Sequence, residues 1–196
     1  MRRKAYSAGA VKFGFWFAEL CKTVQLLRSG KSIGEIKALS ENENIFAAAT
    51  PPRARQIYAT VSARASSLTD AYYDIFIESS IETQKIIALI SIMNTDALFF
   101  DFMNEVYREK LMTGDTFLND ADFRVFFLAK QRESEKVAAW TDQTLDRLRQ
   151  SYKAYLAESG LIERGAGTRK IKKPLIDGRL ASLLSESGMG IILQGS

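Results

Sequence analysis

One stretch, residues 140–176, constrains the fold more than any other part of the chain. Thr141 is a good N-cap for a helix because its hydroxyl can accept a hydrogen bond from a free backbone N–H. Gly160 can take the left-handed backbone conformation that commonly ends a helix. Between them, apolar residues recur at the spacing that places them on one side of a helix: Leu145, Leu148, Tyr152, Tyr155 and Leu156. We therefore expect a long amphipathic helix between Thr141 and Gly160.

The residues that follow predict a small basic β-hairpin. A short segment, 161–163, and a longer segment, 169–176, flank the turn-like residues 164–168, which include two glycines. Residues 160–176 have a net charge of +4, and their cations are Arg164, Arg169, Lys170, Lys172 and Lys173. A helix followed by a basic hairpin is the shape of a winged helix, in which the helix enters the DNA major groove and the wing lies on the phosphates. The alternative is a solvated edge hairpin whose lysines discourage aggregation.

The N-terminal third of the chain predicts three helices. Residues from about 7 to 28 repeat apolar side chains at helical spacing. Ser32 and Glu35, three residues apart, form the capping box that begins a second helix. Thr50 is a good N-cap for a third helix, from about 51 to 68, whose first two residues are prolines. Proline is tolerated there because its missing N–H has no partner in the first turn.

The second and third of these helices fit a helix-turn-helix, in which the N-terminal end of the second helix reads bases. The helix from about 51 to 68 carries a polar stripe that we expect to face DNA: Arg53, Gln56, Thr60 and Arg64. The chemistry is specific, because the Arg guanidinium matches guanine and the Gln amide matches adenine. An ordinary helical hairpin is the alternative, since the connection is longer than the tight turn of the common motif.

A second helix-turn-helix candidate lies in the C-terminal half. It consists of a helix from about 120 to 132, a connection that ends at Trp140, and the amphipathic helix that begins at Thr141. On that last helix, the residues that we expect to face DNA are Gln143, Arg147, Gln150 and Lys153.

Charge divides the chain into three parts. Residues 1–68 hold 11 Lys and Arg against 4 Asp and Glu, residues 69–123 hold 3 against 11, and residues 124–196 hold 13 against 8. If the two basic ends meet in the fold, they form a face suited to a polyanion. We divide the chain into an N-terminal helical region before residue 69, an acidic helical scaffold at 69–133 and a winged-helix-like region at 134–196, which together form one compact unit.

The composition argues against several classes of function. The chain has no His, which removes the usual general base and the commonest metal ligand. Its single Cys, Cys21, lies in an apolar run and is expected to be inert, and no spaced set of metal ligands is present. Its longest apolar stretch is much shorter than the ~20 residues that a membrane helix needs. We therefore expect no enzymatic activity, no metal, no cofactor, no small-molecule substrate and no membrane insertion, in a cytoplasmic protein.

Over nearly its whole length, the chain resembles the BrxA family of the BREX bacteriophage-exclusion systems. The resemblance rests on four features: Tyr6-Ser7-Ala8-Gly9 before an aromatic helix, the helix start Thr50-Pro51-Pro52-Arg53, the long central helical block, and the Trp140-Thr141 helix that runs into Gly160-Leu161-Ile162 and the basic segment. It implies a helical protein similar to nucleic-acid-binding proteins of the antitermination type. It also implies two helix-turn-helix elements beside a positive surface, binding of double-stranded DNA and no enzymatic activity.

The sequence thus predicts a mostly helical fold with two helix-turn-helix-like elements and a small C-terminal β-hairpin wing. As function, it predicts a non-enzymatic double-stranded DNA-binding accessory protein of a BREX system, with other BREX components as possible partners. The alternative is an assembly module whose basic ends dock an acidic protein partner, without DNA affinity of its own. RNA binding ranks lower, because no exposed aromatic platform can be identified.

Overall fold

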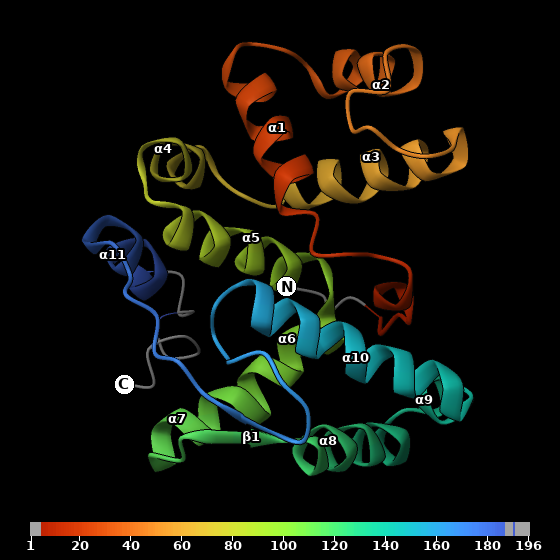
Figure 1. Cartoon of the computed structure of the whole chain (residues 1–196), viewed down its shortest axis with the longest axis vertical. Coiled ribbons are helices and arrows are strands. Elements are labelled where there is room, and N and C mark those ends of the chain that lie inside the picture. The colour runs from red at the N-terminus through yellow and green to blue at the C-terminus, as the bar shows by residue number, and fades with distance from the viewer. Residues whose placement is uncertain (1–4, 187–189, 191–196) are drawn as a thin grey trace.

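The computed structural model describes residues 5–186 and residue 190, so the two ends of the chain lie outside the described residues. Its helices are stacked in three tiers (Figure 1). The upper tier holds α1 (Phe17–Arg28), α2 (Ile33–Asn42) and α3 (Pro51–Ser66). The middle tier holds α4 (Asp70–Glu78), α5 (Ile81–Thr95) and the C-terminal α11 (Gly178–Glu186).

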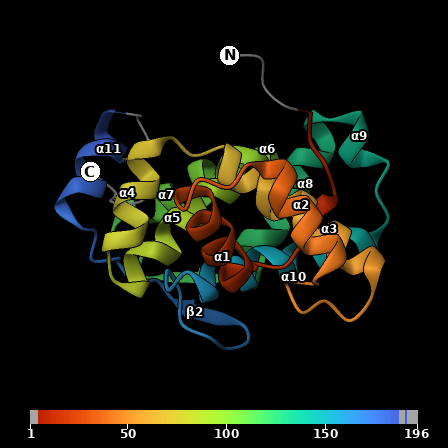
Figure 2. The same ribbon diagram turned by 90° about the horizontal axis from the view of Figure 1, so that it is seen from above.

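The lower tier begins with one continuous helical segment, called the rod below: α6 (Ala97–Phe102), the π-helical turn η2 (Met103–Tyr107) and α7 (Arg108–Thr113). Next come the strand β1 (Phe117–Asn119) and the helices α8 (Asp120–Glu133) and α9 (Glu135–Ala138). The helix α10 (Asp142–Glu158) lies between α5 and α8, and the strand β2 (Thr168–Lys170) pairs with β1. Figure 2 shows α4 and α11 at one end of the molecule and α2, α3 and α9 at the other. The expected mostly helical fold class is confirmed.

Local capping signals place the helices as expected. The Ser32 hydroxyl accepts a hydrogen bond from the Glu35 N–H at 3.2 Å, and the Glu35 carboxylate accepts from the Ser32 N–H at 2.7 Å. Thr50 caps α3, and Thr141 caps α10 by accepting from the Thr144 N–H at 3.2 Å. Each bond satisfies a backbone donor that would otherwise lack a partner in the first helical turn.

Aromatic side chains form the centre of the core. Phe99 and Phe102 of α6 pack against Tyr152 of α10, with ring centroids 4.9 and 5.6 Å from the Tyr152 ring. Phe123 of α8 stacks on Phe102 at 4.8 Å. A smaller apolar cluster holds the upper tier together, and its buried members are Ile36, Phe46, Ile57 and Val61. The apolar stripe expected on α10 is confirmed, since all five of its residues are buried.

The hairpin after α10 is shorter than expected and has a second partner. Ile162 pairs with Ile171 in a single antiparallel bridge, next to hydrogen bonds from Glu163 N–H to the Lys170 carbonyl and from Lys172 N–H to the Leu161 carbonyl. The opposite edge of β2 pairs with β1 in antiparallel register. β2 therefore lies between residue 162 and β1, a strand that the sequence did not reveal.

The expected helix from 7 to 28 is wrong in its first half, because α1 begins only at Phe17. Residues 5–16, the N-terminal strap, contain only the 3₁₀ turn Gly9–Val11 and run from the lower end of α1 to the side of α10 (Figure 1). Gly9 and Gly14 weaken helix formation there. The carbonyls of the strap are instead satisfied by side chains of α3 and α10, which fixes its extended course.

Candidate nucleic-acid interface

The N-terminal strap joins the two helices on which the sequence places DNA-facing residues. From α10, the Ser151 hydroxyl donates to the Ala10 carbonyl at 2.9 Å, and the Tyr155 hydroxyl donates to the Phe13 carbonyl at 2.5 Å. From α3, the Arg53 guanidinium donates to the Lys12 carbonyl at 3.2 Å. A shallow groove with the strap as its floor is lined by Arg53 on one side and by Ser151 of α10 on the other.

The first three residues of the α3 stripe remain near solvent. Arg53 is exposed, and its guanidinium lies 4.8 Å from the centroid of the Trp16 ring and donates to the Gln56 side chain at 2.6 Å. Gln56 and Thr60 are half-buried, and the Thr60 hydroxyl donates to the Gln56 carbonyl at 2.9 Å. The Arg53 side chain is therefore positioned by the Trp16 ring, the Gln56 amide and the Lys12 carbonyl. The Gln56 side chain is in turn oriented by its bond to Arg53.

Arg64, the fourth residue of that stripe, requires a correction. Its side chain is only 3% exposed, and its guanidinium donates to the carbonyls of Gly14 at 2.9 Å and Phe15 at 2.7 Å. Burial lowers the pKa of Arg64 from its usual range, because removing a cation from water favours the neutral form. Arg64 fastens the strap to α3, and its buried position keeps it out of reach of a DNA backbone or base edge.

The start of α3 offers side chains to a ligand, but no free backbone donor. Pro51 and Pro52 have no N–H, the Arg53 N–H is directed to the Thr50 hydroxyl, and the Ala54 N–H donates to the Thr50 carbonyl. Where a helix N-terminus binds phosphate, free backbone N–H groups donate to the phosphate oxygens. Recognition at this end of α3 must therefore come from the Arg and Gln side chains.

On α10, the structure separates one predicted residue from the other three. Gln143, Arg147 and Gln150 are exposed along one stripe of the helix. Lys153 is half-buried; its ammonium group lies 2.7 Å from the Asp120 carboxylate and 5.2 Å from the Phe123 ring centroid. Lys153 therefore links α10 to the start of α8. Its charge is partly neutralised by Asp120, so less of it is offered to a ligand in solution.

The predicted wing also contains one structural cation. Arg169 is 7% exposed, and its guanidinium donates to Asp120 at 2.7 Å and to the Gly167 carbonyl at 2.9 Å. This residue is a second correction to the predicted DNA contacts, because its charge is used inside the protein. Lys153 and Arg169 together lower the pKa of the Asp120 carboxyl, in that order of strength.

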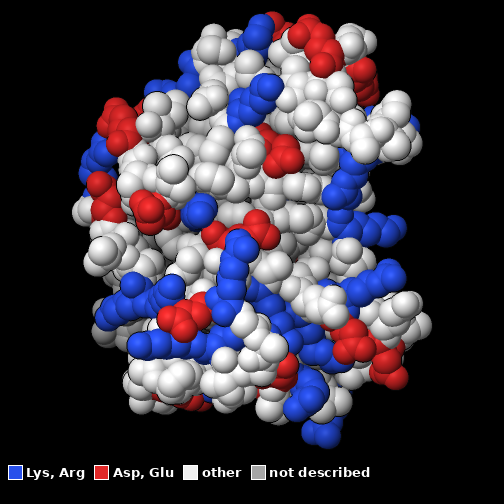
Figure 3. Space-filling view, in the orientation of Figure 1, with Lys and Arg blue, Asp and Glu red and all other residues white. Residues whose placement is uncertain are grey.

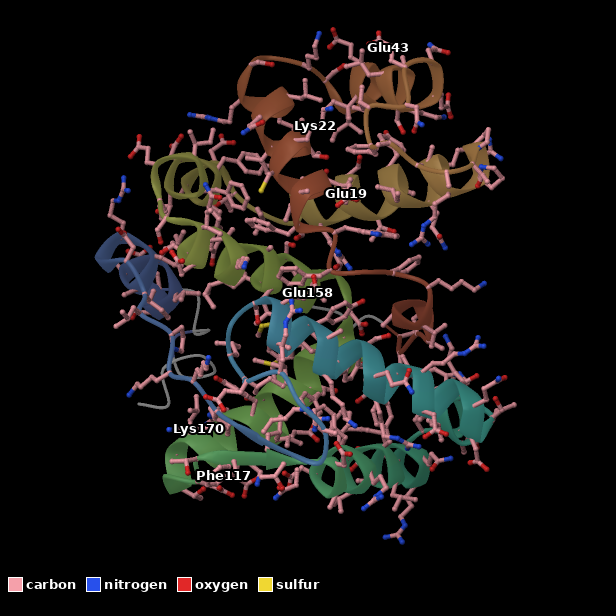
Figure 4. All side chains as sticks on the ribbon, viewed as in Figure 1. Glu19, Lys22, Glu43, Phe117, Glu158 and Lys170 are labelled. Carbon is pink, nitrogen blue, oxygen red and sulfur yellow. The ribbon has the colours of Figure 1, made fainter. Side chains whose placement is uncertain are left out.

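The other four wing cations face solvent: Arg164, Lys170, Lys172 and Lys173. Within the described part of the chain, none of these four forms an ion pair shorter than 4.0 Å, and the same holds for Arg147. Lys170 stands opposite Phe117 in the register of the sheet (Figure 4). Figure 3 shows basic side chains in a band across the lower half of this face, with a few acidic side chains among them.

Two further charged residues belong to this face, and the sequence did not single them out as site residues. Lys12 is exposed on the strap, in the groove between Arg53 and α10. Glu158, at the C-terminal end of α10, lines the same groove and is labelled in Figure 4. Partial burial raises the pKa of the Glu158 carboxyl, and Arg164 and Lys85 oppose the shift. The helical pattern hid Lys12, because this part of the chain was expected to be helix.

The described residues show no other kind of site. They contain no group of three or more Cys, Asp and Glu side chains able to hold a metal ion. No single described helix is long and apolar enough to cross a membrane. Among the described helices, α5 and the rod from Ala97 to Thr113 are long and apolar enough only as a pair, and the chain bends by 113° between them. The expectations of no metal and no membrane insertion remain predictions.

The fold and this face define a class: a mostly helical globular protein with a basic surface shared by two helices, an N-terminal strap and a small sheet. Comparison with known proteins identifies the family. The chain matches the family model of BrxA over residues 4–188. It is 42% identical over 177 residues to the BREX protein BrxA of Bacillus cereus strain H3081.97, covering 90% of this chain and 88% of that protein. The chain belongs to the BrxA family.

A solved structure has the same fold. The crystal structure of an uncharacterized protein from Magnetospirillum magneticum superimposes with a TM-score of 0.79, covering 98% of this chain and all of that one. The two sequences are 17% identical, so the match concerns the fold alone.

Proposed function

We propose that this chain is a non-enzymatic accessory protein of a BREX phage-defence system and that it binds double-stranded DNA. The BREX assignment rests on membership of the BrxA family and on the name of the Bacillus cereus relative. The proposed DNA-binding face comprises the strap, the N-terminal half of α3, the exposed stripe of α10 and the four exposed cations of the wing. Other BREX components are the expected protein partners, and the proposed location is the cytoplasm.

The observation that carries the DNA proposal is the position of the strap. Arg53 of α3 donates to the Lys12 carbonyl and Ser151 of α10 donates to the Ala10 carbonyl, so the strap bridges the two helices, and this supports the proposal that their polar sides form one surface. Two helices with exposed Arg and Gln side chains, separated by a strap that carries a Lys, suit base edges flanked by phosphates. This arrangement unites the two helix-turn-helix candidates, which lie about 90 residues apart in the sequence.

The topology of the lower tier supports the winged-helix part of the proposal. In chain order it runs from the rod that ends with α7 to β1, α8, α9 and α10, and then to the bridge at Ile162, the turn and β2. β2 pairs with β1 in the two-stranded sheet, and Ile171, the residue after β2, forms an isolated bridge with Ile162. This places the basic turn beside the C-terminal end of α10, where a wing contacts the DNA backbone in such modules.

The charge of the face sets the size of the effect. Seven exposed cations belong to it: Lys12, Arg53, Arg147, Arg164, Lys170, Lys172 and Lys173. If each neutralises one phosphate, the slope of log K against log salt concentration is about −6, because each contact releases about 0.9 counterion. A slope of this size makes binding tight in dilute buffer and much weaker at high salt.

The test is a titration of labelled duplex DNA at several salt concentrations, with single-stranded DNA and RNA as competitors. A variant with Lys170→Glu and Lys172→Glu is expected to flatten the slope by about 2. The matched control carries Arg124→Glu and Arg132→Glu, two exposed cations on α8 outside the proposed face, and should keep the parental slope. Equal slopes for the two variants would remove the wing from the proposal.

The second candidate function is an assembly module that docks an acidic protein through the same cations and has no DNA affinity of its own. The exposed wing lysines form no ion pair within the described residues, and such free cations suit an acidic protein surface as well as they suit the phosphates of DNA. The same titration separates the two, because an assembly module gives no duplex binding near physiological salt. Arg53→Ala then distinguishes them further: it should weaken duplex binding by about 1–3 kcal/mol if the residue contacts a guanine.

A further inference from the structure

The solvent-facing side of α8 carries two large apolar side chains next to its exposed cations Arg124 and Arg132. Phe123, Phe126 and Phe127 pack inward, whereas Val125 and Leu128 on the opposite side are 65% and 54% exposed. A surface helix of a globular protein normally carries polar residues opposite its buried stripe. Exposed apolar side chains indicate a contact surface where they continue into a larger apolar patch.

Next to this apolar side lies a groove between α8 and the rod formed by η2 and α7. Its volume is about 530 Å³, and its apolar lining comes from Val106 on the rod and from Val125, Phe126 and Ala129 on α8. The wall on the rod side contains the π-helical turn Met103–Tyr107. Such turns interrupt regular helices and frequently occur at functional sites. The groove has two helical walls and an apolar floor, the shape that receives a third helix.

The rim of the groove is acidic. Its carboxylates are Glu105, Glu109, Asp115 and Asp122, and the one cation in the lining is Lys110. The Lys110 ammonium group lies 2.8 Å from Asp115 and 3.1 Å from Asp122, so its single charge is shared by two carboxylates. Glu105 pairs with Lys130 at 2.7 Å, whereas Glu109 has no cation within 4.0 Å among the described residues. The groove therefore retains a net negative charge.

We propose that this groove docks a basic amphipathic helix of a partner protein. Apolar residues of that helix, spaced by three and four, would cover Val125 and Leu128 and fill the floor. Lysines or arginines on its flanks would meet Glu109 and the other rim carboxylates. Charge complementarity favours this occupant, since an acidic helix or a nucleic acid is repelled by the rim. The site is independent of the proposed DNA-binding face, which is basic.

The test uses the purified chain and three fluorescent synthetic peptides, each long enough for four helical turns. The first is a basic amphipathic helix with Leu at positions i, i+4 and i+7 and Lys elsewhere. The second has the same composition in scrambled order, and the third replaces every Lys by Glu. The expected result is binding of the first peptide, at least about tenfold weaker binding of the scrambled peptide and no binding of the acidic one.

Two variants locate the binding. Val125→Asp places a charge on the apolar wall at an exposed position and should weaken binding of the basic amphipathic peptide by at least about tenfold. Leu175→Asp is the matched control, because Leu175 is 92% exposed and does not line the groove, and should bind like the parent. Duplex affinity of Val125→Asp should equal that of the parent, so failure of this site and failure of the DNA proposal are told apart.

Three outcomes overturn the proposal. These are equal binding of the ordered and scrambled basic peptides, an unchanged affinity in Val125→Asp, and no binding of the basic amphipathic peptide even at high micromolar concentration. Sedimentation of the parent and of Val125→Asp covers the remaining possibility. If the parent self-associates and Val125→Asp does not, the groove is an interface between copies of this chain, and the proposed partner is wrong.

Discussion

Replacing Arg64 separates structural cations from those proposed to contact DNA, because this residue was predicted to face DNA and is buried. In Arg64→Met, the carbonyls of Gly14 and Phe15 lose their donor. Each hydrogen bond from a charged group contributes about 1.5–3 kcal/mol. Part of that loss is offset, because the variant no longer removes a guanidinium from water. We expect the free energy of unfolding to fall by about 2–4 kcal/mol.

The assay is urea unfolding, followed by tryptophan fluorescence, to which Trp16 contributes from 5.9 Å beside the Arg64 guanidinium. The control is Arg55→Met, which removes an exposed cation of α3 that has no hydrogen bond to the strap among the described residues, and should change stability by less than about 1 kcal/mol. Duplex binding should rank the variants differently: Arg53→Met weakens it, and a folded Arg64→Lys variant retains it. If Arg64→Met is as stable as Arg55→Met, the strap is not held by Arg64 and the reasoning is refuted.

Three further changes test the scaffold. Asp120→Asn removes the carboxylate shared by Lys153 and Arg169, and because that carboxylate is 41% exposed, the free energy of unfolding in urea should fall by only about 1–2 kcal/mol. The control Asp146→Asn, at an exposed ion pair, should cost less than about 0.5 kcal/mol, and equal costs would argue against the role of Asp120. Burial raises the pKa of Asp96 to about 6, so the parent loses stability as pH rises from 4 to 7 and this carboxyl ionises inside the fold. The free energy of unfolding of Asp96→Asn should therefore rise by about 3 kcal/mol relative to the parent over that window, and a pH-independent difference would contradict this. Gly160→Ala should destabilise the fold by about 1 kcal/mol because φ is +83° there, whereas Gly34→Ala inside α2 should stabilise it by about 0.5–1 kcal/mol. Thermal unfolding that ranks the two variants in the reverse order refutes the argument.

Signals that depend on near neighbours in the chain were readable from the sequence. The caps at Ser32, Thr50 and Thr141 each involve a residue three positions further on, so a short window contains both partners. The apolar stripe of α10 was equally visible, because burial on one side repeats within each turn. These local features also placed the polar stripe of α10 on its exposed side.

Signals that depend on distant parts of the chain were not readable. Arg64 finds its carbonyl partners 49 and 50 residues earlier, and Arg169 finds Asp120 49 residues earlier. A polar residue at helical spacing looks the same in sequence whether it meets water or a buried carbonyl. β1 has three residues and gains its partner only when β2 folds against it. The strap was expected to be helix because apolar residues recur at helical spacing from about residue 7 to 28, whereas its bonds to α3 and α10 decide its course.

The central claim is that α3 and α10 present one DNA-binding surface across the strap. The most direct measurement is NMR of the isotope-labelled chain during titration with a short duplex, following Lys12, Arg53, Arg147 and Gln150 together. The claim predicts that these four signals shift with one common affinity, while Val125 on α8 stays unchanged. Shifts confined to one of the two helices, or two separate affinities, would contradict a shared surface.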